Sequence, residues 1–464
     1  MIGNPEMVRE FSSVLRKKAS KQKKRNWCIV LHRCCNFRNE YRSICLYLTP
    51  MNQPLQSQIS EVLQKLETLL DRVPESVAKD VRQEIREFRQ LLVETRSPRF
   101  ALVGRRGSGK SSLINAIFGR KVAEVGHEKA QTGEATWWPY SSDMGTLDIL
   151  DTRGLQEGSR PDEADAATSP IESILNALKE KAPDLILFLI KATEADSGIN
   201  PDLEALTEIS KTVEKVHNYR PPILVVATHC DTLEPKNVRL HQPEDEDPED
   251  LNEKLERVKV IENLLKTKFE ADPYLKESLI TVLGVSSYQS WKNDRLRSDE
   301  RWRIDELLDY IFNELPKESK LAFARLSQVR TLQESIANRL TKVVAAICGG
   351  IAAVPIPLGD IIPITSLQIT LIIAIAYVAG RQLSQDTAKE FLTAIGATIS
   401  AGLVLRELAR ASVKIFFPGV GSAVSAGIAT TATLGIGRAA TAHFIQKKSI
   451  ENAKAVFEGE RSRP

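Results

Sequence analysis

Cysteine is scarce in this sequence outside its first fifty residues. Of the six cysteines in the 464 residues, only Cys230 and Cys348 lie beyond residue 50. A chain of this length with two body cysteines has no disulfide framework, which excludes a small secreted scaffold held by disulfides. We therefore expect a reducing compartment.

Positive charge is also scarce once the first fifty residues are set aside. Residues 1–50 contain eleven Lys and Arg against three acidic residues, a net charge of +8. The net charge of the whole chain is +3, so the other 414 residues carry −5. Binding to nucleic acid needs clustered positive charge. No nucleic-acid partner is therefore expected for the body of the protein.

Residues 1–50 differ in composition from everything after them. The basic run at 16–25 is typical of a contact with anionic lipid or nucleic acid. Four side chains could ligate a metal: Cys28, His32, Cys34 and Cys45. No Cys-x-x-Cys pair accompanies them, and the apolar run at 27–31 is too short for a signal peptide. We interpret this leader as a disordered, dispensable or mis-assigned start before a true initiator at Met51, and assign it no function.

Residues 51–96 are the first predicted folded segment. Apolar residues recur there at intervals of three and four, on both sides of Pro74. Such a stripe is the packing face of an amphipathic helix. We expect two helices that pack beside the C-terminal part of the chain, because both segments flank the central domain and both offer apolar faces.

Residues 97–318 alternate between short apolar runs and amphipathic stretches. The apolar runs predict buried strands at 100–103, 147–150, 185–190, 223–227 and 280–285. The stretches between them predict helices at 111–118, 171–181, 201–216, 251–269 and 304–315. This alternation is typical of a mostly parallel sheet with helices on both faces. The acidic residues 244–250 are expected to form an exposed insertion between a strand and a helix.

A phosphate-binding loop follows the first predicted strand. The pattern G-x-x-x-x-G-K-[ST] is matched in full by Gly104, Arg105, Arg106, Gly107, Ser108, Gly109, Lys110 and Ser111, with Ser112 continuing into the helix. The glycines let backbone N–H groups turn inward around a phosphate at the positive end of a helix. Lys110 is expected to bridge the terminal phosphates of a nucleotide, and the Ser111 hydroxyl to ligate Mg²⁺.

Two further motifs select the nucleotide. Asp151 and Gly154 follow a predicted strand with the order and spacing of the D-x-x-G motif of a GTPase, in which the Asp holds Mg²⁺ through water and the Gly N–H senses the γ-phosphate. Thr228, His229, Cys230 and Asp231 follow the next strand but one, where a GTPase has N/T-K-x-D. The Asp231 carboxylate can accept from guanine N1–H and the exocyclic amine, a donor pair that adenine lacks. Ser286 and Ser287 occupy the place of the last guanine-contacting loop.

With these motifs, residues 97–316 resemble the Era-like branch of the translation-factor-related small GTPases. The resemblance implies a Ras-like α/β P-loop fold, GTP or GDP with Mg²⁺ as ligands, and GTPase activity. It also implies a switch threonine that caps Mg²⁺ and the γ-phosphate. Thr132 is the better candidate, since it precedes the expected second strand, and Thr136 is the alternative.

The sequence departs from the family pattern at three positions. His229 replaces the Lys that packs along the base, and Arg153 replaces the usual Pro. Leu155 stands where Ras-type proteins have the Gln that orients the attacking water, which implies slow intrinsic hydrolysis. Another group, such as a cation or a partner protein, must then assist hydrolysis in place of this Gln. Arg105 and Arg106 are expected to face solvent, so Arg153 is the better candidate for a catalytic cation in the same chain.

Residues 319–464 are predicted to form a hydrophobic helical domain. Four stretches contain no charged residue, at 343–359, 361–380, 392–405 and 415–437. The second and the fourth are long enough to cross a bilayer, which takes about 20 apolar residues. The alternative is a buried helical bundle, because Gly- and Ala-rich helices also pack closely in water. Residues 325–455 resemble the C-terminal domain of YcjF-like proteins, which implies membrane association and no established chemistry.

These observations leave three functions open. The first is a GTPase switch with slow Mg²⁺-dependent hydrolysis that controls a helical domain on the cytoplasmic face of a membrane, with membrane contact through residues 340–440. The second is a remodelling GTPase of the dynamin-like or immunity-related type, whose hydrolysis follows assembly into a homo-oligomer. The third is a nucleotide-binding adaptor that hardly turns over. A soluble cytoplasmic protein is the alternative localisation.

Overall fold

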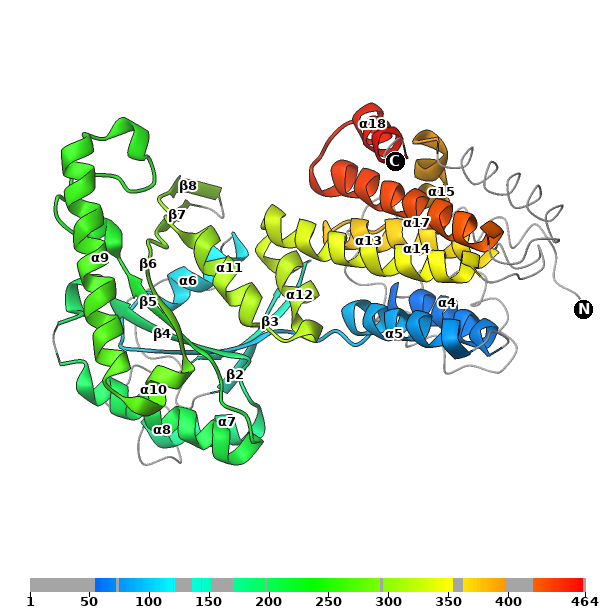
Figure 1. Cartoon of the computed structure of the whole chain (residues 1–464). Coiled ribbons are helices and arrows are strands. Elements are labelled where there is room, and N and C mark those ends of the chain that lie inside the picture. The colour runs from blue at the N-terminus through cyan, green and yellow to red at the C-terminus, as the bar shows by residue number, and fades with distance from the viewer. Residues whose placement is uncertain are drawn as a thin grey trace, which may run out of the picture. The chain divides into compact units, whose positions relative to one another are not determined.

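A computed structural model describes ten stretches of the chain (Figure 1): residues 55–71, 75–119, 121, 136–142, 144–151, 170–196, 198–292, 295–353, 362–396 and 420–461. The leader, Thr132, Arg153, Gly154 and Leu155 lie outside these described residues. The predictions for them therefore stay predictions.

The central domain contains a six-stranded sheet in the order β2-β3-β1-β4-β5-β6. Its strands are β1 (Arg99–Gly104), β2 (Thr136–Ser142), β3 (Gly145–Asp151), β4 (Leu185–Lys191), β5 (Ile223–Thr228) and β6 (Leu279–Gly284). All neighbouring pairs are parallel except β2 with β3. The five predicted strands are confirmed, and the expected second strand is an antiparallel edge strand.

The two faces of the sheet are covered by different helices, as Figure 1 shows. Alternate residues of a strand point to opposite faces. Phe100 and Leu102 of β1 pack in one core with helices that include α6 and α11, whereas Ala101 and Val103 pack in a second core with α7 and α8. Both faces are therefore apolar, which is why the strands read as continuous hydrophobic runs rather than alternating ones.

The helices of this domain agree with the predicted stretches to within a few residues. They are α6 (Lys110–Phe118), α7 (Pro170–Glu180), α8 (Asn200–His217), α9 (Pro248–Glu270) and α11 (Ile304–Glu314). A further short helix, α10 (Pro273–Ser278), was not predicted. The acidic stretch is only partly an insertion. A short 3₁₀ turn covers Pro243–Asp245, and Asp247 caps α9 by accepting from the Glu249 and Asp250 N–H groups.

The sequence analysis missed one small sheet. β7 (Gln289–Lys292) and β8 (Arg295–Asp299) form an antiparallel pair after β6. Both strands are mostly polar and none of their residues is fully buried, so they lack the apolar run that identified the other strands.

The helical domain is built from both ends of the described chain. Its helices are α4 (Leu55–Leu70), α5 (Glu75–Leu92), α12 (Lys317–Ser327), α13 (Arg330–Ala353), α14 (Ile362–Val378), α15 (Gln385–Ala394), α17 (Val420–Ala440) and α18 (Ile450–Arg461), with a π-helical turn at Thr441–Ile445. The expected packing of the N-terminal helices on the C-terminal ones is confirmed. Glu87 of α5 pairs with Arg339 of α13, and Val81 lies against Gly350.

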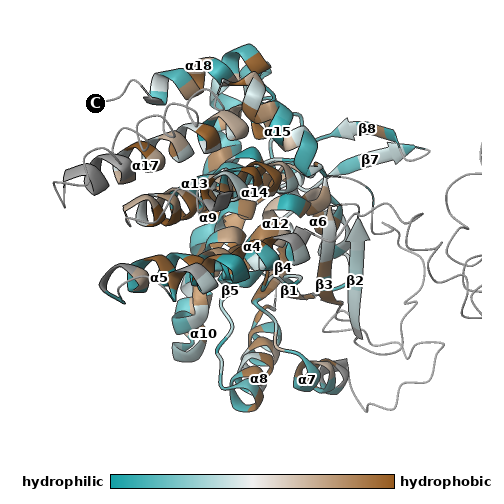
Figure 2. Ribbon diagram, turned by 90° about the vertical axis from the view of Figure 1, so that its right-hand side faces the viewer, coloured by the Kyte–Doolittle hydropathy of each residue, from teal (hydrophilic) through white to brown (hydrophobic). Residues whose placement is uncertain are grey.

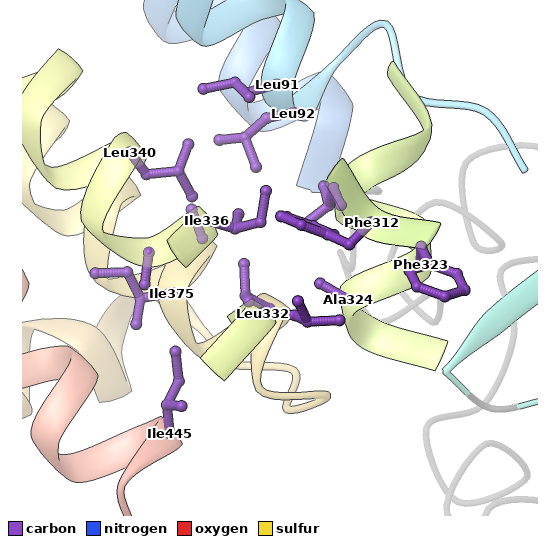
Figure 3. Packing of buried hydrophobic residues seen from close by; sticks show 14 of the residues in the cluster. Leu91, Leu92, Phe312, Phe323, Ala324, Leu332, Ile336, Leu340, Ile375 and Ile445 are labelled. Carbon is purple, nitrogen blue, oxygen red and sulfur yellow. The ribbon is translucent and has the colours of Figure 1, made fainter. Parts of the chain in front are cut away.

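A single hydrophobic core joins this helical domain to one face of the sheet. Figure 3 shows Leu92 of α5, Phe312 of α11, Phe323 of α12 and Ile336 of α13 within it. The Phe323 ring meets that of Phe100 on β1 edge to face, with centroids 5.8 Å apart. The junction is therefore a packed apolar contact rather than a polar linker.

One described helix, α13, is long and apolar enough to cross a membrane, and most of its apolar window is buried inside the protein. The expected span at 361–380 corresponds to α14, which has 17 residues and is shorter than the roughly 20 that a bilayer needs. Figure 2 shows hydrophobic residues along α13 and α14. Leu367, Leu371 and Ile375 of α14 are fully buried, which fits the alternative of a helical bundle.

Candidate nucleotide-binding site

The phosphate-binding loop lies between β1 and α6, where the pattern predicts it. Gly107 and Gly109 have positive φ angles of 76° and 87°, a left-handed backbone that favours glycine. Gly104 is needed for a different reason. A Cβ atom at this position would lie 2.4 Å from the Leu189 carbonyl oxygen of β4. The loop conformation thus depends on all three glycines of the motif.

Lys110 begins α6 and its side chain lies across the mouth of the loop. The Lys110 ammonium donates to the carbonyl oxygens of Gly104 at 2.9 Å and Arg105 at 3.1 Å. An ammonium in this place faces the region where inward-turned N–H groups would bind a phosphate. Ser111 and Ser112 follow in the first turn of α6 and are partly exposed.

Thr228 connects the phosphate-binding loop with the guanine motif. It ends β5 and is fully buried. Its hydroxyl lies 2.9 Å from the Ser108 carbonyl oxygen and 3.2 Å from that of Ile190, and can donate to either. Because the Ser108 carbonyl belongs to the loop, Thr228 holds the phosphate-binding and base-binding segments together across 120 residues of sequence.

His229 lies beside the same loop. It has a left-handed backbone with φ 60°, and a Cβ atom on Gly109 would lie 3.3 Å from its Cε1. Its Nδ1 is 2.9 Å from the Thr228 hydroxyl oxygen. Burial lowers the pKa of His229, so the imidazole is neutral at neutral pH. His229 therefore contributes a flat, uncharged surface where the GTPase pattern has a lysine.

Asp231 is held in place by a lysine that the sequence analysis missed. Lys254 of α9 is fully buried, and its ammonium donates to the carbonyl oxygens of Asp231 at 2.7 Å, Val238 at 2.8 Å and Pro235 at 3.1 Å. Burial lowers the pKa of Lys254. The spacing of Lys254 from the buried Val258 on the same helix was the available signal, since it places the lysine on the apolar face.

Ser286 and Ser287 follow β6 and are buried. The Cys230 N–H donates to the Val285 carbonyl oxygen at 3.2 Å, so this segment lies directly beside the one that contains Asp231. Ser286 also exchanges two backbone hydrogen bonds with Trp302, of 3.2 and 2.9 Å. The structure thus brings both predicted base-contacting segments to the same end of the sheet as the phosphate-binding loop.

The expectation that Arg105 faces solvent is wrong. Its Nε donates to Asp202 Oδ2 at 2.8 Å, and its Nη2 donates to the Gly198 carbonyl oxygen at 2.7 Å. Asp202 lies in the first turn of α8 and is 2% exposed, so burial raises its pKa while the Arg105 guanidinium opposes that shift. Arg105 therefore anchors the loop to α8. Arg106 is exposed, as expected.

The residues expected to hold Mg²⁺ are only partly described. Asp151 ends β3 and pairs in register with Leu102 of β1, so its backbone lies near the end of the sheet at which β1 leads into the phosphate-binding loop. A carboxylate and a hydroxyl are the hard oxygen donors that Mg²⁺ prefers. Among the described side chains no cluster of three or more His, Cys, Asp or Glu could hold a metal. Thr136 begins β2, whereas Thr132 lies outside the described residues. The choice between the two threonines therefore stays open.

Comparison with known proteins identifies the central domain. Residues 99–229 match the family model described as "50S ribosome-binding GTPase". The tRNA modification GTPase MnmE of Chlorobium chlorochromatii is 26% identical over 217 residues, which are 42% of this chain and 43% of that protein. GTPase Der of Persephonella marina is 28% identical over 174 residues, 38% of this chain and 36% of that protein. The chain spans less than half the length of these curated relatives.

Solved structures that the chain matches include Toc33 from Arabidopsis thaliana, with 17% identity and a TM-score of 0.33 over 53% of this chain and 94% of that chain. Era of Aquifex aeolicus bound to GDP·AlF4⁻ has 20% identity and a TM-score of 0.31 over 55% of this chain and 68% of that chain. The family match does not extend to residues 325–455, so their relation to YcjF-like proteins stays a prediction. The central region therefore matches a GTPase family model over residues 99–229 and has the P-loop GTPase fold with a mostly parallel sheet.

Proposed function

We propose, from the P-loop GTPase domain that this chain contains, that the protein binds GTP with Mg²⁺, hydrolyses it slowly and uses the nucleotide state as a switch on its helical domain. One observation carries the binding proposal. Thr228 joins the phosphate-binding loop to the segment with Asp231, so that both ends of a guanine nucleotide are recognised by one rigid unit.

Each residue of the unit has a distinct task. The loop N–H groups and Lys110 bind the terminal phosphates, and Asp231 accepts from the guanine edge. Ser111 and Asp151 would hold Mg²⁺, which supplies charge neutralisation between the phosphates when bound. Slow turnover is inferred from Leu155, because its apolar side chain cannot orient the attacking water. Arg153 is the proposed cation in the same chain.

The switch proposal is supported by the β2–β3 hairpin. β2 begins directly after residues 122–135, which include the preferred switch threonine, Thr132. β3 ends at Asp151, three residues before Gly154 and four before Leu155. A change of either segment on hydrolysis would therefore act on the base of this hairpin.

The turn of the same hairpin contacts the helical domain. A Cβ atom on Gly380, just after α14, would lie 2.5 Å from Met144 Sδ, so the methionine packs directly on that glycine. On the other side, Leu326 of α12 is 3.6 Å from a Cβ placed on Gly145. Arg325 lies over the Tyr377 ring at 3.5 Å and holds α12 against α14 at this place. The hairpin thus extends from the nucleotide-binding end to two helices of the bundle.

Nucleotide binding is tested by titrating a fluorescent GTP analogue into Lys110→Ala. Loss of the ammonium from the phosphate-binding loop should reduce affinity by at least about 10²-fold, as expected for a charged hydrogen-bond donor removed from a polyanion. Lys259→Ala is the matched control, because Lys259 is an exposed lysine of α9 that pairs with Glu256. Wild-type affinity in Lys110→Ala would refute the assignment of the loop.

The switch is tested by hydrogen exchange with GDP and with a non-hydrolysable GTP analogue. Exchange in α12–α14 should differ between the two nucleotides, and Met144→Ala should reduce that difference without changing affinity. Leu296→Ala removes an exposed apolar side chain from the β7–β8 hairpin and serves as control. Identical exchange with both nucleotides in the wild-type protein would contradict a switch.

Turnover at increasing protein concentration separates this proposal from its alternatives. A simple switch has a constant rate per molecule, whereas an assembly-driven remodelling GTPase, the homo-oligomeric alternative, accelerates steeply. An adaptor shows almost no turnover at any concentration.

We further propose that the protein acts on the cytoplasmic face of a membrane. The proposal rests on the charge-free stretches within 340–440 and on the basic residues at their ends, such as Arg381 and Arg438. Carbonate extraction of cell membranes tests it. Recovery of the protein in the soluble fraction before extraction would favour the soluble alternative.

A further inference from the structure

The guanine motif of this chain lacks the cation that its family pattern has. The second position of the motif is His229, which burial keeps neutral, as described above. A lysine there would pack along the base and place a positive charge near the sugar and phosphates. The local sequence Thr228–Asp231 contains no other basic residue.

A lysine from the neighbouring strand lies where this charge is missing. Lys191 is the last residue of β4 and pairs in register with Thr228 of β5. A Cβ atom on Gly107, in the phosphate-binding loop, would lie 3.5 Å from Lys191 Nζ and 3.6 Å from its Cε. The ammonium therefore lies beside the loop, and β4, which carries it, lies between β1, which leads into the loop, and β5, which leads into the guanine motif.

The position between the two motifs specifies what Lys191 would contact. Phosphates bind at the loop that contains Gly107, and the base is recognised by Asp231, so the ribose and the phosphate next to it must pass between them. His229 already lies beside Gly109 in this passage. Lys191 is close enough for its charge to act on His229.

We infer that Lys191 is a further nucleotide-binding residue, which donates to the ribose–phosphate part of the guanine nucleotide and replaces the lysine absent from the guanine motif. This inference rests on the proposed binding of GTP. It places the cation at the end of β4, whereas the family pattern has it directly after β5.

The present partner of Lys191 does not prevent this role. Lys191 Nζ lies 3.1 Å from Glu194 Oε1, three residues further along the chain. The two side chains are 31% and 35% exposed. Ion pairs this open to water are weak, so the ammonium can turn to a polyanionic ligand at little cost.

The experiment measures GTP and GDP affinity in Lys191→Met, with Lys259→Met as the matched control. Lys259 also pairs with an acidic residue three positions away, but on the outer surface of α9. Lys191→Met should bind both nucleotides about tenfold more weakly, as expected when one charged donor is removed. The control should bind as the wild type does.

A second variant separates a nucleotide contact from a structural role. His229→Lys should restore most of the affinity of Lys191→Met, because it returns a lysine to the position in the family pattern. In the protein that keeps Lys191, the same change should increase nucleotide affinity only slightly, because one lysine is already present. Unchanged affinity in a folded Lys191→Met, or a loss that His229→Lys does not repair, would overturn the inference. Failure of the wild-type protein to bind GTP would instead refute the proposed function.

Discussion

The nucleotide-binding end of the sheet and the helical domain are stabilised in opposite ways. At the sheet end, buried polar side chains hold loops by their backbone carbonyls, as Thr228 and Lys254 do. In the helical domain, helices are held by apolar side chains and by small residues at their contacts. Hydrogen bonds to loop carbonyls fix the orientation of a few backbone groups at the sheet end. Apolar contacts fix only how far apart the helices lie and how much space their side chains fill.

The contact of α13 with α17 shows how small residues set that distance. A Cβ atom on Gly349 would lie 2.2 Å from Thr430 Oγ1, and one on Gly437 would lie 2.3 Å from Thr341 Oγ1. The two helices approach so closely that only glycine fits at these positions. Substitutions should therefore affect stability in the helical domain and ligand affinity at the sheet end.

The largest expected effect on stability is that of Phe323→Ala, at the junction of the two regions. Phe323 is fully buried against Phe100, so its removal leaves a cavity between α12 and the sheet. The free energy of unfolding should fall by about 3–5 kcal/mol. Denaturant titration measures this change. A loss below about 1 kcal/mol would mean that the junction is not closely packed in solution.

Asp231→Asn tests the sheet end through ligand affinity alone. The change removes a carboxylate acceptor and turns an amide donor toward guanine N1–H, so affinity for GTP should fall roughly 10²-fold. Thermal unfolding should hardly change, because the Asp231 side chain is partly exposed. Competition by ATP as strong as by GTP against the wild-type protein would contradict guanine recognition.

Gly437→Ala and Gly427→Ala form a matched pair on α17. The added methyl group at 437 would meet Thr341 and should cost about 1–3 kcal/mol of unfolding free energy. The same change at 427 meets nothing within 4 Å and should be neutral or stabilise the helix slightly. Equal effects at both positions, measured by denaturant titration, would disprove the close approach of α13 and α17.

The smallest expected effect is the pH dependence that Lys254 contributes. Its pKa in the folded protein is below the ordinary value of 10.5, so the unfolded chain binds more protons between the two values. Stability from this group therefore rises as pH increases through that window. Lys254→Met should lose this rise, which is measured as the difference in unfolding free energy between wild type and variant as the pH increases toward 10.5. Parallel pH profiles would show that Lys254 titrates normally.

The sequence allowed most of the sheet and the phosphate-binding loop to be predicted. The buried strands are continuous apolar runs, and the loop motif is contiguous from Gly104 to Ser111. The β7–β8 pair could not be predicted, because its strands are mostly polar and contain no apolar run. The position of Arg105 could not be predicted either, since its partner Asp202 lies 97 residues further along the chain.

By itself, the sequence was enough to predict the chemistry proposed for this protein, because the residues expected to bind phosphate and guanine occur in short motifs at the ends of strands. Only the tertiary structure decided which side chains hold those motifs in place. Lys254 reaches the carbonyl oxygen of Asp231 only because α9 packs beside that loop, and Lys191 lies beside the phosphate-binding loop only because β4 pairs with β1. The physical reason is that a buried donor must find acceptors, and the packing of the fold determines which carbonyls are within its reach.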